Sequence, residues 1–473
     1  MATKLDLDPG MEHELNKLSF KEAPKIISEI PGPKSREILA TEMENETPTR
    51  VTPTVLSMVW EESKGATIKD PDGNYFIDLT AGIAVNNVGH CHPKVVETIR
   101  QECGLLMHNP DATTSHRARL GKKLQEIAPG ELRGNARMTY GLSGSSAVEI
   151  ATKFARGATG KSHIIAFHGA YHGVMGSTLG YTTSQQFRAN YRPLNPFVYH
   201  VGPYAYCYRC PWKMEHPRCD LECAKYVEHL MLSPSTGIDI ESVAAMIVEP
   251  IQGEGGYVPP PEGFINALKN ICEKAGILYI DDEVQAGMGR TGKMFAIDHY
   301  GITPDFITLG KALGGDLPFS AVIMKKEIAE NLGPMSHILT AAGNATSCAV
   351  ACTNLDLLQD GIVSRAEQLG NYTLAVLKEM MNEVEIIGDV RGKGMMIAIE
   401  LVRNRDTKEP LDYGEILQLL WALRDSGVLF LPCGRYSNVF RMMPPLVITK
   451  EHLDKALEII RDVLKDNQGS ILV

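Results

Sequence analysis

Residues 279–293 read Y-I-D-D-E-V-Q-A-G-M-G-R-T-G-K, and residues 307–316 read I-T-L-G-K-A-L-G-G-D. Each segment begins with a short apolar run, and these runs end at the acidic pair Asp281-Asp282 and at Lys311. Short apolar runs that stop abruptly predict buried parallel strands. Because the carboxyl ends of parallel strands in an open α/β sheet line one crevice, we expect a carboxylate and an amine to meet there.

An amine in such a crevice can form a Schiff base with a carbonyl cofactor, and a buried carboxylate can keep a pyridine nitrogen protonated. This pairing is the chemistry of pyridoxal phosphate (PLP). A single lysine before a glycine-rich turn is weak evidence, but several motifs occur here in order. They are D-E-V-Q at 282–285, G-R-T-G at 289–292, Pro304-Asp305 and K-A-L-G-G at 311–315. Together they resemble the signature of the class III aminotransferases, a branch of the fold-type I PLP enzymes.

The resemblance implies a role for three of these residues. Lys311 would bind the cofactor covalently and then carry the proton between substrate and cofactor. Asp282 would hold the pyridinium proton, and Gln285 would hydrogen-bond the phenolic oxygen.

The composition is that of an ordinary globular protein, with 473 residues, 44% hydrophobic and 22% charged. A net charge of -10 and the lack of a basic run argue against nucleic acid and anionic membranes. The N-terminus has no apolar signal core, and no run of about eighteen apolar residues occurs. The sequence therefore predicts a cytoplasmic protein.

A chain of this length predicts two domains. Alternating strand and helix patterns between about 162 and 324 predict an α/β domain with a mostly parallel sheet, and the resemblance implies a seven-stranded-type sheet flanked by helices. We expect a large PLP-binding domain at 81–345 and a smaller α+β domain at 346–473. Residues 1–80 would form an N-terminal arm, packed on a partner, and part of the small domain, including a hairpin over 59–78.

Residues 141–146, G-L-S-G-S-S, form a glycine-bearing turn that opens a predicted helix. The amides of Gly144 and Ser145 at a helix N-terminus would favour a phosphate dianion, although Ser-Gly-Ser is also an ordinary N-cap. The family has S-G-T-E-A-N-E here, so Ser146 and Val148 depart from its usual Glu and Asn.

The segment F-H-G-A-Y-H-G at 167–173 follows a predicted strand. The resemblance implies that Tyr171 stacks on the pyridine face, while His172 is interpreted as structural rather than as an acid or base. Many family members carry a carboxylate-binding arginine where this chain has Val174.

A further strand ends in E-P-I-Q-G-E at 249–254. By resemblance Glu249 supports the site, and Glu254 pairs with Arg441 of the R-M-M-P-P-L segment, a match to the family's R-x-x-P-P-L. Arg441 would bind a substrate carboxylate bidentately, and Glu254 would neutralise it when the other substrate presents no carboxylate.

Residues 337–344, H-I-L-T-A-A-G-N, resemble the family's H-G-S-T-x-G-G-N. The threonine of that motif reaches the phosphate of the neighbouring subunit's cofactor. The resemblance therefore implies, through Thr340, a homodimer or higher homo-oligomer with shared active sites.

Four of the ten cysteines are clustered at Cys207, Cys210, Cys219 and Cys223, and the other six are scattered, as small core residues are. The clustered spacing is compatible with zinc, with His216 as a spare ligand, with one or two disulfides, or with free thiols. The resemblance places this segment in a loop after the third or fourth strand of the large domain, where the family has no required metal.

Our first interpretation is an ω-aminotransferase that moves an amino group from a donor such as 4-aminobutyrate or ornithine to 2-oxoglutarate. The alternative is an amino-acid racemase or epimerase on the same scaffold, with Lys311 and Glu254 on opposite faces of the cofactor. A non-enzymatic binding module is disfavoured because Lys311 and Asp282 are both present.

Overall fold

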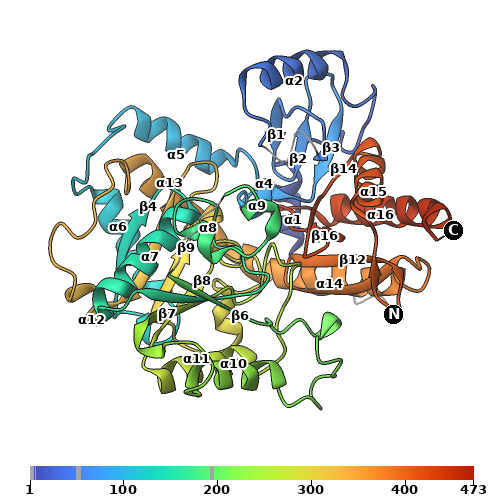
Figure 1. Cartoon of the computed structure of the whole chain (residues 1–473). Coiled ribbons are helices and arrows are strands. Elements are labelled where there is room, and N and C mark those ends of the chain that lie inside the picture. Colours follow the sequence, from blue (N-terminus) through green and yellow to red (C-terminus); the bar gives the residue numbers. More distant parts are fainter. Residues whose placement is uncertain (1–4, 6, 50–54, 192–196, 473) are drawn as a thin grey trace. The chain divides into compact units, whose positions relative to one another are not determined.

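The computed structural model describes residues 5, 7–49, 55–191 and 197–472, and the chain divides into two compact units (Figure 1). Residues 94–363 form the larger unit, and the segments before and after it together form the smaller one. The units divide after Pro93 and after Val363, whereas the sequence placed the boundaries at 80 and 345.

A seven-stranded sheet forms the centre of the larger unit. Its strands lie in the order β4-β10-β9-β8-β7-β5-β6, and every neighbouring pair is parallel except the two pairs made by β10. The predicted α/β fold with a mostly parallel sheet is therefore confirmed. The strands are β4 (Ala136–Gly141), β5 (His163–Phe167), β6 (Val198–Val201), β7 (Val243–Val248), β8 (Leu278–Asp282), β9 (Phe306–Leu309) and β10 (Ser320–Lys325).

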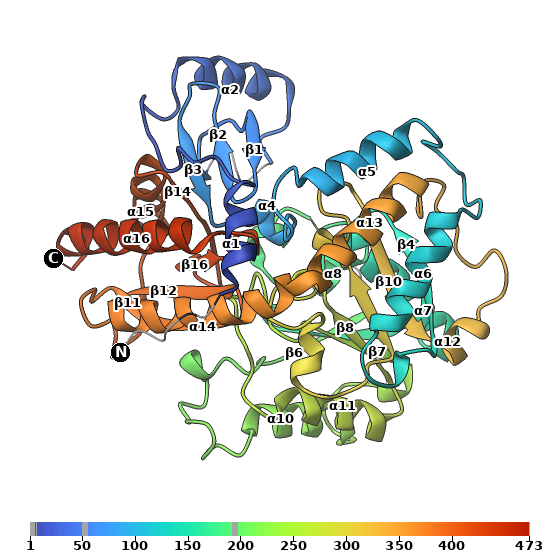
Figure 2. The ribbon, with the colours of Figure 1, turned by 180° about the vertical axis from the view of Figure 1, so that it is seen from behind.

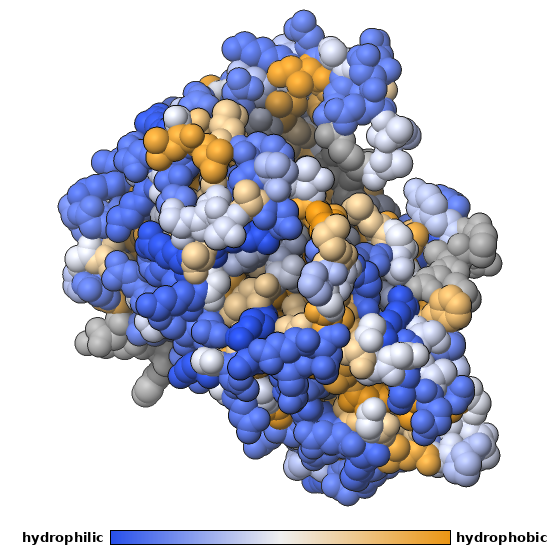
Figure 3. Space-filling model, turned by 90° about the vertical axis from the view of Figure 1, so that its left-hand side faces the viewer, coloured by the Kyte–Doolittle hydropathy of each residue, from blue (hydrophilic) through white to orange (hydrophobic). Residues whose placement is uncertain are grey.

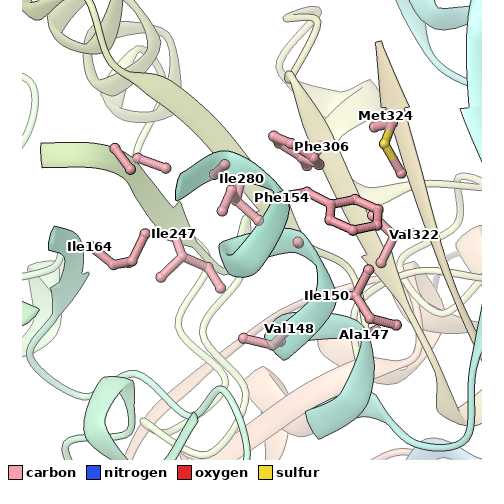
Figure 4. Close-up of a cluster of buried hydrophobic side chains, with 14 of the residues drawn as sticks. Ala147, Val148, Ile150, Phe154, Ile164, Ile247, Ile280, Phe306, Val322 and Met324 are labelled. Atoms are coloured by element: carbon pink, nitrogen blue, oxygen red, sulfur yellow. The ribbon is translucent and has the colours of Figure 1, made fainter. Parts of the chain in front are cut away.

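Helix α7 (Gly144–Thr159) covers one face of this sheet. Its buried residues include Ala147, Ile150 and Phe154, at the spacing of one helical face, and they pack against strand residues such as Ile247 and Ile280 (Figure 4). Successive strand side chains point to opposite faces, so the neighbours of these two residues face away from α7.

The other face of the sheet packs against α11 (Phe264–Ala275), where the thiol of Cys272 lies 3.8 Å from the sulfur of Met246. Figure 2 shows α13 running beside α6 in the same unit. The remaining helices of this unit are α5 (Pro93–Cys103), α6 (Ser115–Ile127), α8 (Thr178–Tyr181), α9 (Gln185–Arg188), α10 (Glu222–Leu232), α12 (Lys326–Glu330) and α13 (Ala345–Leu357).

The smaller unit contains two sheets, with strand orders β1-β2-β3-β14 and β11-β12-β16-β15, and β13 pairs with β12. The predicted hairpin is present as β1 to β3, in antiparallel register. The strands are β1 (Glu62–Lys64), β2 (Thr67–Lys69), β3 (Tyr75–Asp78), β11 (Ile387–Lys393), β12 (Met396–Asn404), β13 (Glu409–Pro410), β14 (Val428–Leu429), β15 (Leu431–Cys433) and β16 (Val439–Met442).

The N-terminal segment packs within this smaller unit. The side chain of Arg365 donates to Glu12, and the backbone of Lys25 forms an antiparallel β-bridge with that of Tyr75. Its packing on a partner stays a prediction. The helices of the unit are α1 (Pro9–Asn16), α2 (Pro33–Asn45), α4 (Ala81–Ala84), α14 (Val363–Met380), α15 (Tyr413–Asp425) and α16 (Lys450–Ile471).

Strands β4 and β6 were not anticipated from the sequence. Both lie at the edges of the seven-stranded sheet, and both are only partly buried. Because they are half-covered, they lack the continuous apolar run by which the central strands are recognised.

Among the described residues, no helix is long and apolar enough to cross a membrane. The face shown in Figure 3 is predominantly hydrophilic, with apolar residues in separate small groups. Of the six scattered cysteines, Cys272, Cys348, Cys352 and Cys433 are buried as expected, whereas Cys91 and Cys103 are exposed.

Candidate active site

The loops that follow five strands of the larger unit meet at one pocket of about 660 Å³. These strands are β4, β5, β7, β8 and β9, and their carboxyl ends share one edge of the sheet. Eight of the ten residues expected in the site line this pocket: Gly144, Ser145, Tyr171, Glu249, Glu254, Asp282, Gln285 and Lys311.

The N-terminus of α7 forms the end of the pocket that suits an anion. The backbone N–H of Ser146 donates to the hydroxyl of Ser143 at 3.2 Å, and the hydroxyl of Ser146 accepts from the N–H groups of Leu142 and Ser143 at 2.9 Å. Ser146, which departs from the family pattern, therefore supports the turn itself. The amides of the first helical turn have no helical acceptor, so those of Gly144 and Ser145 remain available to a ligand.

A glycine is required at position 144 because the loop that follows β8 passes close to its Cα. A Cβ at this position would lie 2.6 Å from a methyl group of Val284, which also lines the pocket. The helix terminus and the loop after Asp282 are therefore in direct contact.

Asp282 is almost fully buried, and three groups hold its carboxylate. One oxygen lies 2.6 Å from Nδ1 of His172, and the other accepts from the Thr308 hydroxyl at 3.0 Å and from the N–H of Val284 at 3.1 Å. The carboxylate is thus fixed in position before any ligand binds. The sequence analysis did not predict that His172 holds Asp282. The available signal was the position of His172 next to Tyr171, in the segment that follows β5.

Only one of the three consecutive acids Asp281, Asp282 and Glu283 lines the pocket. Burial raises the pKa of Asp281 well above its usual value, and it raises the pKa of Glu283 to about 7. Glu283 accepts the N–H of Ile297 at 2.7 Å. Burial therefore favours the protonated form of Asp281 at neutral pH, and Asp282 is the acid of this strand that lines the pocket.

Lys311 is separated from the end of β9 by Gly310 alone and has a backbone φ of +38°, in the left-handed region. A non-glycine residue there costs about 1–2 kcal/mol. The conformation is held because the carbonyl of Lys311 accepts from the N–H groups of Gly314 and Gly315, at 3.1 and 2.9 Å. Strained conformations that the surroundings enforce are frequent at functional sites.

Glu249 ties together two loops of the pocket. Its carboxylate accepts the N–H of Tyr171 at 2.9 Å and the N–H of Gly253 at 2.8 Å. Burial, partly offset by His172, raises the pKa of Glu249 to about 7. Glu249 thereby positions the loop that carries Tyr171.

This raised pKa gives a testable pH dependence. A carboxyl group whose folded pKa lies above its unfolded value stabilises the fold at low pH, and this stability is lost as the pH rises through about 7. In the cofactor-free wild-type protein we expect Glu249 to lower the free energy of unfolding by up to about 3 kcal/mol as the pH rises from 4 to 8. Glu249→Gln should remove this decrease. Urea unfolding across that range would measure it, with exposed Glu241→Gln as the control. An unchanged slope in the Glu249 variant would contradict this account.

The residues present fit a phosphorylated aromatic aldehyde. The helix N-terminus suits the phosphate, Tyr171 offers an aromatic face, and Asp282 and Lys311 offer a carboxylate and an amine. The amide oxygen of Gln285 is buried and makes no hydrogen bond within the described residues, and exchanging the oxygen and nitrogen of this amide would present a donor to a ligand there.

The two remaining expected residues do not line this pocket. Thr340 is exposed on the loop between α12 and α13 of the larger unit. Arg441 is a buried residue of β16 in the smaller unit.

The fold and the pocket define the class of protein as a fold-type I PLP-dependent enzyme. The family model for class-III aminotransferases matches residues 49–464, and the chain belongs to that family.

The relatives within the family differ in reaction. The chain is 38% identical to the alanine/serine racemase of Pyrococcus horikoshii over 94% of its own length and 93% of the relative's. It is 35% identical to the 4-aminobutyrate aminotransferase of Mycobacterium tuberculosis strain H37Rv, over 95% of its length and 99% of the relative's. A crystal structure of a Bacillus anthracis aminotransferase superposes with a TM-score of 0.85 at 30% identity, covering 92% of this chain and 99% of that one.

Proposed function

We propose that this protein is a PLP-dependent aminotransferase that moves an amino group from an ω-amino acid or diamine-type donor, such as 4-aminobutyrate or ornithine, to 2-oxoglutarate. The observation that carries the proposal is the meeting of Lys311 and Asp282 in one pocket with the N-terminus of α7. The similarity to a 4-aminobutyrate aminotransferase supports the choice of donor.

When bound, PLP supplies an aromatic ring that withdraws electrons from the substrate carbon that loses its proton. The amides of Gly144 and Ser145 would hold the phosphate. Asp282, fixed by His172 and Thr308, would keep a proton on the ring nitrogen, and Gln285 would donate a hydrogen bond to the phenolic oxygen. Tyr171 would cover the ring and exclude water, and the amine of Lys311 would hold the cofactor and act as the base that carries the proton.

For the two substrates we propose separate roles for Arg441 and Glu254. Arg441 binds the carboxylate of 2-oxoglutarate, because a guanidinium can bind a carboxylate through two hydrogen bonds. Glu254 neutralises Arg441 when the amino donor presents no carboxylate to it.

Arg441→Ala is expected to slow the half-reaction with 2-oxoglutarate by roughly 30-fold or more, since losing one partner of a buried charge pair costs about 2–5 kcal/mol. The half-reaction with the ω-amine should lose much less. Single-turnover absorbance measurements would compare the two, with Arg441→Lys as the variant that keeps the charge but not the forked geometry. Equal losses in both half-reactions would count against these roles.

The second candidate is an amino-acid racemase. The 38% identity to an alanine/serine racemase favours it, and Lys311 and Glu254 both line the pocket from which acid and base would act. A panel of amino donors with 2-oxoglutarate, run beside a chirality assay on L-alanine and L-leucine without any oxo acid, separates the two. New amino acid formed only in the presence of the oxo acid supports the aminotransferase, whereas loss of optical activity in its absence supports the racemase.

We further propose a homodimer in which Thr340 binds the phosphate in the neighbouring subunit. Its exposed position in the larger unit is compatible with this role. Light scattering would give the oligomeric state, and a monomer with full activity would overturn the proposal.

A further inference from the structure

Two groups of ionisable side chains in the larger unit lie outside the active-site pocket. The first consists of the four cysteines between β6 and α10, which line a second pocket of about 380 Å³: Cys207, Cys210, Cys219 and Cys223. Each is a free thiol in this structure, and among the described residues no three His, Cys, Asp or Glu side chains are arranged to hold a metal ion, which counts against the zinc interpretation. The second consists of the two acids that flank Asp282, namely Asp281 within β8 and Glu283 directly after it.

Asp281 and Glu283 lie on the face of the sheet opposite to the active-site acid. Ile280 packs on the α7 face, and side chains alternate along a strand, so Asp282 points to the same face as Ile280 and Asp281 points to the other. The strand pairing continues one residue further, because the N–H of Glu283 donates to the carbonyl of Thr308 at 3.0 Å. Glu283 therefore lies next to Asp281 on the same face.

Both carboxyl groups are enclosed by protein, and three of their four oxygens receive no hydrogen bond from a donor. Asp281 is 0% exposed and Glu283 is 1% exposed. Within the described residues no N–H or O–H donates to either oxygen of Asp281 or to Oε2 of Glu283, whereas Oε1 of Glu283 accepts from Ile297. Two ionised carboxylates in such an interior are unfavourable, because a buried charge without a partner tends to be neutralised by taking up or losing a proton.

The surroundings supply no positive charge that would take the place of this proton. The ionisable groups that interact with the pair are three tyrosines and two acids: Tyr204, Tyr279, Asp282, Asp298 and Tyr300. On α11, Lys269 is paired with Glu273 at 3.3 Å and with Asp305 at 3.6 Å. Burial, followed by the nearby charge of Glu283, accordingly raises the pKa of Asp281 well above its usual value.

We propose that Asp281 keeps a proton at neutral pH and donates it to Oε2 of Glu283, so that the two acids share one proton and together position the loop that carries Gln285. The two side chains lie within hydrogen-bonding reach of each other. A hydrogen bond between two carboxyl groups requires a proton on one of them, and Oε2 is the oxygen of Glu283 that has no other donor among the described residues.

Glu283 closes the loop that supplies one wall of the active-site pocket. Its carboxylate accepts the N–H of Ile297 at 2.7 Å, and its carbonyl accepts the N–H of Gly287 at 3.1 Å. A Cβ at Gly287 would lie 3.1 Å from Oε2, so the turn packs directly on the oxygen to which Asp281 donates. The residues inside this turn line the active-site pocket: Val284, Gln285 and Ala286.

Asp281 is thus a positioning residue that acts through Glu283. Its role toward Gln285 rests on the proposed function, in which Gln285 binds the cofactor, whereas the shared proton does not. The two parts therefore have separate tests.

The shared proton is tested on the cofactor-free full-length protein by infrared difference spectroscopy in D₂O at about pH 8, where ordinary aspartates and glutamates are ionised. We expect the C=O stretch of a protonated carboxylic acid in the wild type. It should be lost in Asp281→Asn, whose amide still donates to Glu283, and in Asp281→Ala. Glu249→Gln should retain it, because the pKa of Glu249 is about 7. A wild type without this band, or a variant at Asp281 that keeps it, would overturn the proposal.

The positioning role is tested by titrating the same cofactor-free proteins with pyridoxal phosphate and following fluorescence. Asp281→Asn should bind with an affinity close to that of the wild type. Asp281→Ala should bind about 10-fold more weakly or worse, because Oε2 of Glu283 is then left without a donor. In a Gln285→Ala background the same substitution should cost almost nothing further, since the residue being positioned is absent.

Equal losses in affinity with and without Gln285 would show that Asp281 supports the fold in general and would overturn its positioning role. A wild-type protein that does not bind pyridoxal phosphate would instead overturn the proposed function together with the role toward Gln285. The infrared result, which needs no cofactor, would stand in that case.

Discussion

Lys311→Ala is expected to lower turnover by about 10⁴-fold or more, whichever of the two reactions the protein catalyses. The substitution removes the amine that binds the cofactor and also the base that moves the proton, and each role alone contributes about 10²–10⁴-fold. A neighbouring lysine is not expected to replace it. The amine is placed by the strained turn at Lys311, with its two hydrogen bonds from Gly314 and Gly315, directly at the carboxyl end of β9.

Steady-state rates with the donor panel and the chirality assay would measure this loss. Lys326→Ala is a matched control, because this lysine lies in the same unit and its ion pair with Glu330, at 3.6 Å, is solvent-accessible on the helix surface. Borohydride reduction of the wild-type protein, followed by peptide mapping, should find the pyridoxyl group on Lys311. A pyridoxyl group on another side chain, or turnover within about 100-fold of wild type in Lys311→Ala, would contradict the proposed role.

The sequence was sufficient to predict the part of the sheet that positions this lysine. The runs ending at Asp282 and Lys311 are buried on both faces, so their composition alone marks them as central parallel strands. Their pairing, with Asp282 opposite Thr308, follows from the α/β arrangement. The edge strands β4 and β6 escaped prediction because a partly covered strand need not be apolar throughout.

The site shows the same division between local and long-range information. Gly144 could be predicted from the glycine-bearing turn that opens a helix, whereas Tyr171 and Gln285 were expected because short motifs after strands resemble those of the family. The contact between His172 and Asp282 joins residues 110 positions apart, one in the segment after β5 and the other at the end of β8, and β7 lies between these strands. Neither local pattern specifies that contact, so the support of the carboxylate became visible only in the fold.

Asp282→Asn is the second prediction with a large expected effect, a loss of about 10³-fold in kcat/KM. The amide keeps the shape of the side chain, and its oxygen can still accept from the Thr308 hydroxyl and the Val284 N–H. The charge that favours a proton on the ring nitrogen is lost, and removing one such electrostatic contact in a dry site typically costs about 10²–10³-fold. A smaller loss is expected for His172→Ala, on the order of 10-fold, because this residue acts through Asp282.

The two substitutions together distinguish a positioning role from an independent one. If His172 acts only by orienting the carboxylate, then adding His172→Ala to Asp282→Asn should cost almost nothing further, since the group being oriented has already lost its charge. Cofactor affinity, measured by fluorescence titration, should follow the same pattern. Losses that multiply, about 10⁴-fold in the double variant, would mean that His172 contacts the substrate or cofactor in its own right. The buried Nε2 of His172, which makes no hydrogen bond within the described residues and lies in a residue lining the pocket, is the atom through which it would do so.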